Sequence, residues 1–204
     1  MKIICVGRNY VAHAKELNNE IPDEPVLFLK PDTAQLRNND PFYIPDWSTD
    51  VHHEVELILR INKLGKNIDK HFSHRYYEEI GLGIDFTARD VQNVLKDKGL
   101  PWEKAKAFDN SAVVCSDFVK IDSLPDKSSI NFRLDVNGKT VQLGNSALMI
   151  FSFDSIIAHV SKYFTLKIGD LIYTGTPAGV GAVKIGDRLE GYLEGNKKFD
   201  FLVK

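Results

Sequence analysis

Short runs of apolar and β-branched residues recur along the whole chain and constrain its fold more than any other feature. Strand-like runs occur at residues 3–6, 26–29, 51–61, 80–84, 113–119, 130–136, 171–174 and 189–193. Between them, the spacing of apolar residues predicts helices at residues 10–17, 88–98 and 154–163. Because strands and helices do not alternate regularly, the pattern predicts an α+β fold with a mixed or largely antiparallel sheet rather than a βαβ fold.

One tight turn can be located from the sequence. Asn137 and Gly138 follow a strand-like run, and both residue types tolerate the positive φ that a two-residue hairpin requires. No repeat or low-complexity linker divides the 204 residues, and 43% of them are apolar, which is enough to bury a core. We therefore expect a single catalytic domain over residues 1–204.

The charge balance argues against several kinds of partner. The chain has 26 basic and 28 acidic residues and a formal net charge of -2, so it has no basic field to attract nucleic acid. No stretch approaches 18 apolar residues and the N-terminal apolar run is too short for a signal peptide, so we expect no membrane partner and a cytoplasmic location. Cys5 and Cys115 lie in apolar runs without a CxxC partner and are expected to be buried thiols.

Two glutamates share one face of the strand predicted at residues 51–61. Glu54 and Glu56 alternate with Val55 and Leu57, which puts the two glutamate Cβ atoms roughly 6 to 7 Å apart on the same face. Two carboxylates at that distance near a core both stay ionised only beside a compensating cation or arginines. The alternative is an exposed acidic face that pairs with lysines.

A third carboxylate occurs where burial would be costly. Asp85 interrupts an apolar run at residues 81–86, where a lone buried carboxylate is unfavourable. Three oxygen donors without histidine or thiolate ligands suit a hard ion such as Mg²⁺ or Mn²⁺, with coordination positions left for water and substrate oxygens. The sequence therefore predicts one divalent cation held by Glu54, Glu56 and Asp85.

Other polar residues allow a catalytic and a structural interpretation. His13 and Glu16 are three apart in a predicted helix, so the carboxylate can raise the basicity of the imidazole, as a general base requires, although surface pairs of this kind are common. Arg8, after the first strand, suits either a substrate carboxylate or a surface ion pair. Lys104 and Lys106 would share a face if their segment were a strand, so the sequence does not separate them.

Five motifs in order along residues 3–190 resemble the fumarylacetoacetate hydrolase family, and most closely its small acylpyruvase and oxaloacetate decarboxylase members. These motifs are Gly7-Arg8-Asn9-Tyr10 with His13 and Glu16, Phe28-Leu29-Lys30-Pro31, His53-Glu54-Val55-Glu56-Leu57, Asp85-Phe86-Thr87-Ala88-Arg89-Asp90, and Thr174-Gly175-Thr176-Pro177. The resemblance implies a mixed β-sandwich or roll with a few short helices, a homodimer, and a small 2-oxo acid as substrate.

The same resemblance implies a role for each of nine residues. The three sets are catalytic His13, Glu16 and Lys106, metal ligands Glu54, Glu56 and Asp85, and substrate-binding Arg8, Gln92 and Thr176. From the residues alone, an exposed helical glutamine explains Gln92 equally well, and Thr176 can simply hold a tight turn.

The function expected from these features is metal-dependent hydrolysis of acylpyruvates. Water deprotonated by the pair of His13 and Glu16 would attack the C4 carbonyl of a 2,4-dioxo acid, and cleavage of the C3–C4 bond would leave a pyruvate enolate and a carboxylic acid. The alternative is oxaloacetate decarboxylation or enol–keto tautomerisation, which needs enolate stabilisation and no attacking water. A metal-stabilised binding protein without turnover is the non-enzymatic alternative.

Overall fold

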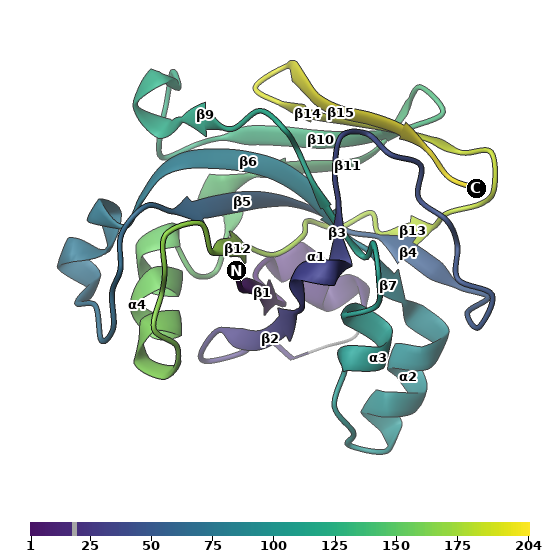
Figure 1. Cartoon of the computed structure of the whole chain (residues 1–204), viewed down its shortest axis with the longest axis horizontal. Coiled ribbons are helices and arrows are strands. Elements are labelled where there is room, and N and C mark those ends of the chain that lie inside the picture. The colour runs from purple at the N-terminus through teal and green to yellow at the C-terminus, as the bar shows by residue number, and fades with distance from the viewer. Residues whose placement is uncertain (18–19) are drawn as a thin grey trace.

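A computed structural model describes residues 1–17 and 20–204. These residues form two main β-sheets that pack against each other, a small third sheet and four short α-helices (Figure 1). The α+β class expected from the sequence is confirmed. In the described ranges, no helix combines the length and the apolar character needed to cross a lipid bilayer.

The large sheet has the strand order β2-β1-β12-β5-β6-β8-β3, with β9 beside β6. β1 runs parallel to β12 and β3 runs parallel to β8, whereas the other pairs are antiparallel, so the sheet is mixed. Its strands are β1 (Ile3–Gly7), β2 (Val26–Lys30), β3 (Gln35–Leu36), β5 (Val55–Ile61), β6 (Tyr77–Asp85), β8 (Ala112–Val114), β9 (Val119–Lys120) and β12 (Leu171–Tyr173).

The other two sheets cover and extend the large one. The second sheet contains β10 (Asn131–Val136), β11 (Lys139–Asn145), β14 (Arg188–Leu193) and β15 (Asn196–Leu202), and the third contains β4 (Val51–His53), β7 (Thr87–Ala88) and β13 (Gly181–Ala182). The predicted hairpin joins β10 to β11. Asn137 and Gly138 have φ values of 53° and 77°, as a tight two-residue turn requires.

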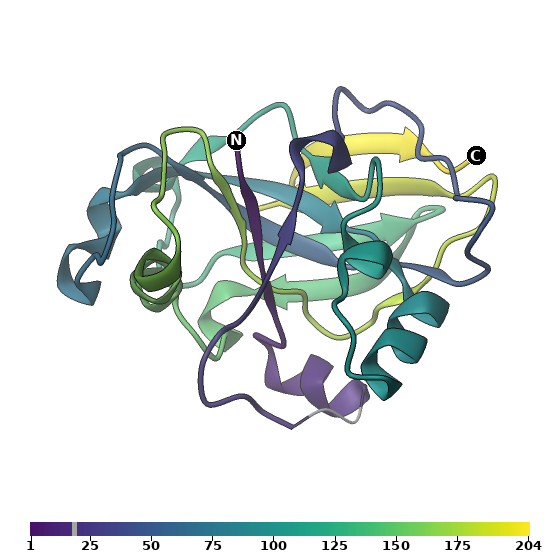
Figure 2. The ribbon, with the colours of Figure 1, turned by 60° about the horizontal axis from the view of Figure 1, so that its bottom comes forward.

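Three of the four α-helices gather at one end of the molecule, and the fourth packs at the other end (Figure 2). The helices are α1 (Val11–Glu16), α2 (Arg89–Asp97), α3 (Glu103–Lys106) and α4 (Phe153–Tyr163). Short 3-10 helices occupy Asp32–Ala34, Lys70–Arg75, Ile121–Ser123 and Ser146–Leu148. Three α-helices match the predicted segments; α3 was not predicted, because four residues are too few to show a helical period.

β5 is buried on both faces, which explains its almost continuous apolar sequence. Leu57 and Leu59 face the core between the two main sheets, whereas Ile58 packs on the opposite face with Ile3 and Tyr173. Burial of each such side chain contributes about 1.5–3 kcal/mol to folding. The Ile58 face is the face on which a strand would also place Glu56, two residues earlier.

Two strand predictions need correction. The segment at 51–61 is not one strand, because the chain passes at Glu54 from β4 in the third sheet to β5 in the large sheet. The segment at 113–119 is also interrupted. Cys115 turns its Sγ toward Leu82 N, at 3.2 Å, and the Phe118 ring fills the space beside Gly81 instead of continuing the strand.

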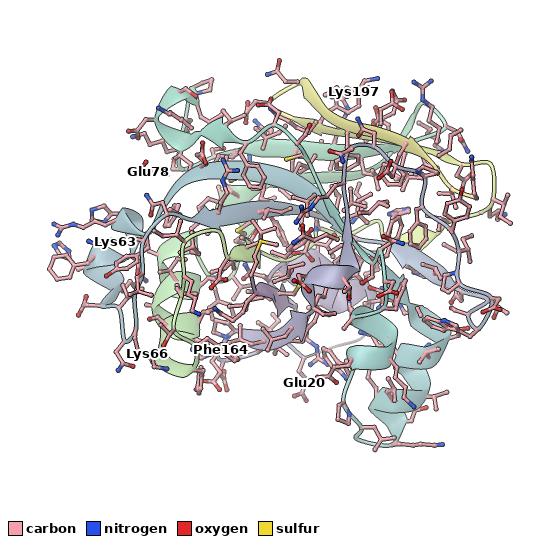
Figure 3. The ribbon with its side chains drawn as sticks, in the orientation of Figure 1. Glu20, Lys63, Lys66, Glu78, Phe164 and Lys197 are labelled. Carbon is pink, nitrogen blue, oxygen red and sulfur yellow. The ribbon has the colours of Figure 1, made fainter. Side chains whose placement is uncertain are left out.

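The two cysteines lie in the interior, and many charged side chains lie on the surface. Cys5 and Cys115 are buried free thiols, as predicted. Charged side chains such as Lys63, Glu78 and Lys197 lie on the periphery (Figure 3).

Candidate metal centre and substrate pocket

A pocket of about 430 Å³ opens where α1, α2 and α3 meet the large sheet. Eight of the nine predicted site residues line it, namely Arg8, His13, Glu54, Glu56, Asp85, Gln92, Lys106 and Thr176. The ninth, Glu16, contacts His13. Residues that are as many as 168 positions apart in the sequence therefore converge on one small cavity.

Three carboxylates converge at the floor of the pocket. One oxygen atom each from Glu54, Glu56 and Asp85 lie within 4.8 Å of one another, and the three residues are at most 5% exposed. Asp85 N donates to Glu54 O at 2.8 Å, which fixes the end of β6 beside the junction of β4 and β5. The backbone thus holds the three carboxylates together.

A glycine makes room for this cluster. Gly83 is the register partner of Glu56, and a Cβ atom there would lie 2.0 Å from Val113 O and 2.6 Å from Ile58 Cδ1. Gly175, with a φ of 99°, donates its N–H to Glu56 Oε2 at 2.6 Å. Glu56 is therefore positioned by one close backbone approach and one backbone hydrogen bond.

Buried cations surround the cluster. Lys106 Nζ donates to Glu54 Oε2 at 2.8 Å and to Asp85 Oδ2 at 2.7 Å. Arg89 pairs with Glu54, and Lys30 Nζ lies 2.7 Å from Asp85 Oδ1. Glu54 and Asp85 are thus compensated by protein cations, whereas Glu56 makes its close contact with a backbone amide.

This difference separates the pKa values of the two glutamates. Burial raises the pKa of Glu54, but Lys106 and Arg89 outweigh it and hold that pKa below its usual range. Burial, reinforced by Asp85 and Glu54, raises the pKa of Glu56 well above its ordinary value. Burial lowers the pKa of Lys106, yet Asp85 and Glu54 raise it overall, so Lys106 is an ammonium.

The donor set fits a hard divalent cation. Three carboxylates supply oxygen ligands only, as Mg²⁺ and Mn²⁺ prefer. Burial raises the pKa of Glu56, and the neighbouring carboxylates of Asp85 and Glu54 raise it further. A divalent ion bound by Glu54, Glu56 and Asp85 would favour the ionised form of Glu56.

His13 and Glu16 form a pair at the rim of the pocket. His13 Nδ1 lies 3.2 Å from Glu16 Oε2, and the imidazole is buried. Glu16 also accepts a hydrogen bond from Gly179 N at 3.0 Å. Because Glu16 engages Nδ1, the other ring nitrogen of His13 is left for proton transfer.

The predicted substrate-binding residues have geometries suited to anions. Arg8 has a φ of 60°, a conformation that is unfavourable for a side-chain-bearing residue and that clusters at functional sites. Gln92 Oε1 accepts from Arg89 Nη1 at 2.6 Å, which leaves its amide N–H groups to donate. Thr176 also lines the pocket and is 3% exposed.

The structure also separates the two lysines that the sequence left equivalent. Their segment is the helix α3 and not a strand, so Lys104 is exposed while Lys106 is 4% exposed and points into the pocket. The strand alternative for this segment was wrong, since the helix is held by bonds from Ala105 N and Lys106 N to Trp102 O.

Sequence reasoning missed several residues that contact the site. They are Lys30, Thr87, Arg89 and Gln142, all of them buried. Thr87 Oγ1 accepts from Lys106 Nζ at 2.6 Å. Lys30 is the last residue of an apolar strand, and Arg89 is the first residue of the helix that follows Asp85. A charged residue next to a buried apolar run was the sequence feature that could have indicated both. No comparable sequence feature marks Gln142, which lies on β11 and reaches the site only through the packing of the second sheet.

An apolar wall completes the pocket. Phe28 and Trp102 pack edge to face with ring centroids 6.1 Å apart, and Leu17 also lines the cavity. These side chains form an apolar part of the pocket lining.

Comparisons with known proteins identify relatives along almost the whole chain. Residues 2–200 match the family described as fumarylacetoacetate (FAA) hydrolase C-terminal. The chain is 45% identical to the mitochondrial oxaloacetate tautomerase FAHD1 of Mus musculus over 99% of this chain and 91% of that protein. It is 42% identical to the oxaloacetate tautomerase YcgM of Escherichia coli over 96% of this chain and 89% of that protein.

A solved structure extends the comparison to the fold. The fumarylpyruvate hydrolase of Pseudomonas aeruginosa, determined in complex with Mn²⁺ and pyruvate, superposes with a TM-score of 0.93 and is 32% identical, covering 100% of this chain and 89% of that chain. The mixed-sheet architecture expected from the motifs is thereby confirmed. The chain belongs to the fumarylacetoacetate hydrolase family of enzymes.

Proposed function

We propose that this protein is a divalent-metal-dependent enzyme that interconverts the enol and keto forms of oxaloacetate. The observation that carries the proposal is the convergence of three buried carboxylates, the Lys106 ammonium and the His13 imidazole on one small pocket. Such a pocket can bind a 2-oxo acid, move a proton at its C3 atom and stabilise the enolate.

A metal held by Glu54, Glu56 and Asp85 would act as a Lewis acid on the 2-oxo acid. His13, oriented by Glu16, takes a proton from C3 of the keto form and returns it in the reverse direction. The Lys106 ammonium stabilises the negative charge that develops at the C2 oxygen. Transfer of the proton from His13 to that oxygen, directly or through water, gives the enol and returns His13 to its neutral form.

The charge of the pocket favours a doubly charged acid. Four cationic side chains, Arg8, Arg89, Lys96 and Lys106, line the pocket together with three carboxylates. A divalent ion would make the balance more positive. Oxaloacetate carries two carboxylates, and acetylpyruvate carries one, so the charge of the pocket suits oxaloacetate better than acetylpyruvate.

The relatives support the tautomerase over the acylpyruvate hydrolysis expected from the sequence. The proteins named oxaloacetate tautomerase are 45% and 42% identical to this chain, and the oxaloacetate decarboxylase of Dictyostelium discoideum is 42% identical. The fumarylpyruvate hydrolase is 32% identical. Decarboxylation of oxaloacetate would release its C4 carboxylate as CO₂ and leave the enolate of pyruvate, which the same pocket could stabilise.

Hydrolysis of acylpyruvates is the second candidate, and one observation favours it. The pair of His13 and Glu16 is held by Gly179 N as well as by its own 3.2 Å contact, as a water-activating pair would be. The same base serves either reaction, because tautomerisation also needs proton transfer.

The discriminating experiment compares three reactions of one preparation. The metal-loaded enzyme is given enol oxaloacetate, keto oxaloacetate and acetylpyruvate, and the decay of enol absorbance, the release of CO₂ and the cleavage of acetylpyruvate are followed. We expect enol–keto interconversion to be the fastest. Faster acetylpyruvate cleavage would establish the hydrolase instead, and no acceleration of any reaction would establish the non-enzymatic alternative.

A pair of variants tests the base. His13→Asn is expected to lower kcat by about 10²–10⁴-fold, the usual contribution of a positioned base. His71→Asn is the matched control, since His71 is exposed on a distant 3-10 helix and should keep wild-type activity. Full activity in His13→Asn would refute the assignment of His13.

A further inference from the structure

Gln142 reaches the pocket wall from outside the large sheet. It lies on β11 of the second sheet and is 1% exposed. Its Nε2 donates to Thr176 Oγ1 at 2.8 Å and to Pro177 O at 2.9 Å. Its Oε1 accepts from Val55 N at 3.0 Å and lies 3.0 Å from His53 Nδ1. The amide thus uses its two donors and its acceptor oxygen at once.

Two backbone groups fix which way this amide points. Val55 N–H can only donate and Pro177 C=O can only accept, so Oε1 must face Val55 and Nε2 must face Pro177. A flipped amide would oppose a donor to a donor and an acceptor to an acceptor. The two backbone partners, Val55 N–H and Pro177 C=O, therefore fix the orientation of the Gln142 amide.

This orientation determines the role of the Thr176 hydroxyl. Because Nε2 of Gln142 has no lone pair to offer, Thr176 Oγ1 must accept from it and must send its own hydrogen elsewhere. Thr176 is 3% exposed and lines the pocket, so the cavity is the direction in which that hydrogen meets a ligand.

We propose that Gln142 is a positioning residue, which turns the Thr176 hydroxyl hydrogen into the pocket to donate to the carboxylate of a bound 2-oxo acid. The proposal rests on the proposed function, because it takes the ligand to be a 2-oxo acid. Gln142 touches neither substrate nor metal and acts through Thr176.

The same amide sets the spacing between two parts of the site. Val55 directly follows Glu54 at the junction where the chain leaves β4, and its N–H bonds to Gln142 there. Thr176 belongs to the turn that follows β12. One side chain therefore ties the anion-binding turn to the strand that carries the metal ligands.

Gln142→Glu keeps the shape of the side chain but reverses the polarity of its contact with Thr176 Oγ1, and it also loses the hydrogen bond that Gln142 donates to Pro177 O. A carboxylate at this position still accepts from Val55 N but also accepts from Thr176, so the Thr176 hydrogen turns away from the pocket. Loss of a hydrogen bond to a charged ligand is expected to weaken pyruvate binding about 10- to 100-fold. KM for oxaloacetate should rise similarly with little change in kcat, because the contact is made in ground and transition states alike.

A double-variant cycle separates positioning from general structural support. Thr176→Val removes the hydroxyl and should weaken pyruvate binding as much as Gln142→Glu does. The double variant should bind pyruvate as tightly as Thr176→Val alone, because both substitutions remove the same hydrogen bond to the ligand. Thr176→Ser restores a hydroxyl and should restore binding. Gln35→Glu is the matched control, since Gln35 lies outside the pocket lining.

Pyruvate affinity for the Mn²⁺-loaded chain, measured by titration calorimetry, is the readout. Independent, additive losses from Gln142→Glu and Thr176→Val overturn the inference, and so does wild-type affinity in either variant. If Gln142→Glu does not fold, Thr176→Val and Thr176→Ser still decide, because equal binding in those two variants overturns it. A wild-type chain that binds pyruvate but does not interconvert enol and keto oxaloacetate overturns the proposed function and leaves this inference standing, which keeps the two failures distinct.

Discussion

Lys106 joins the carboxylate cluster to the substrate space, so its replacement tests the electrostatic account. Lys106→Met removes the ammonium that bonds Glu54 and Asp85 and is expected to lower kcat about 10²–10³-fold at saturating Mn²⁺. Lys104→Met, two residues away on the same helix, should leave kcat unchanged, because Lys104 is exposed. Steady-state kinetics of the two variants would contradict the account if they were equal.

Glu56 makes metal binding depend on pH. Its raised pKa keeps a proton on the carboxyl group at pH values where an ordinary glutamate is ionised, and a metal ligand must be deprotonated. Metal binding should therefore release a proton, and affinity should fall as the pH falls through the raised pKa of Glu56, by about tenfold per pH unit. Calorimetry in two buffers of different ionisation enthalpy measures the proton. Affinity that is independent of pH would show that Glu56 is already ionised.

At the scale of elements, the junctions between sheets place the site. Glu54 lies where β4 gives way to β5, and Asp85 ends β6 just before β7. The alternation of Glu54 and Glu56 predicted their shared side, because a period of two needs only neighbouring residues. The break at Glu54 could not be predicted, because it involves a hydrogen bond from Val55 N to Gln142, which lies 87 positions later in the sequence.

The site residues likewise divide into those that local sequence patterns indicate and those that depend on long-range contacts. The five motifs contain seven of the nine candidate residues, and the wider family resemblance indicated Gln92 and Lys106. The fold brings eight of the nine to one pocket and places Glu16 against His13. The orientation of α3, and with it the choice between Lys104 and Lys106, depends on long-range packing against β2 and β7 that no local pattern encodes.

Gly83 tests the packing of β6 beneath the cluster. Gly83→Ala would place a Cβ 2.0 Å from Val113 O, so β8 must shift, and we expect a loss of about 1–3 kcal/mol or more in unfolding free energy. Gly181→Ala is the matched control, because a Cβ atom there would lie 3.4 Å from His53 Nε2, an ordinary van der Waals distance. Urea unfolding measures both variants. Equal stability would show that β6 and β8 adjust freely.

At the scale of the whole molecule, the metal should stabilise the fold, because its ligands come from β5, β6 and the junction before β5. At a free Mn²⁺ concentration of 100 times Kd, linkage gives about 2.7 kcal/mol, which corresponds to a rise in Tm of about 5–10 °C for a chain of this size. Calorimetric scans with Mn²⁺ and with a chelator measure the rise. A Tm that Mn²⁺ leaves unchanged would contradict a folded-state metal site.

Two whole-molecule expectations from the sequence stay predictions. A homodimer should appear in light scattering at about twice the 23.0 kDa of one chain. The cytoplasmic location is likewise a prediction; the named relatives include mitochondrial proteins and one from Escherichia coli.

The most direct measurement of the central claim is the rate of enol–keto interconversion of oxaloacetate by the wild type and by Glu56→Gln, each with Mn²⁺ and with a chelator. Glu56→Gln keeps an oxygen that can accept from Gly175 N, so the fold should persist while a charged ligand is lost. We predict rapid interconversion only in the wild type with Mn²⁺. Equal rates in all four samples would contradict a metal centre built from Glu54, Glu56 and Asp85.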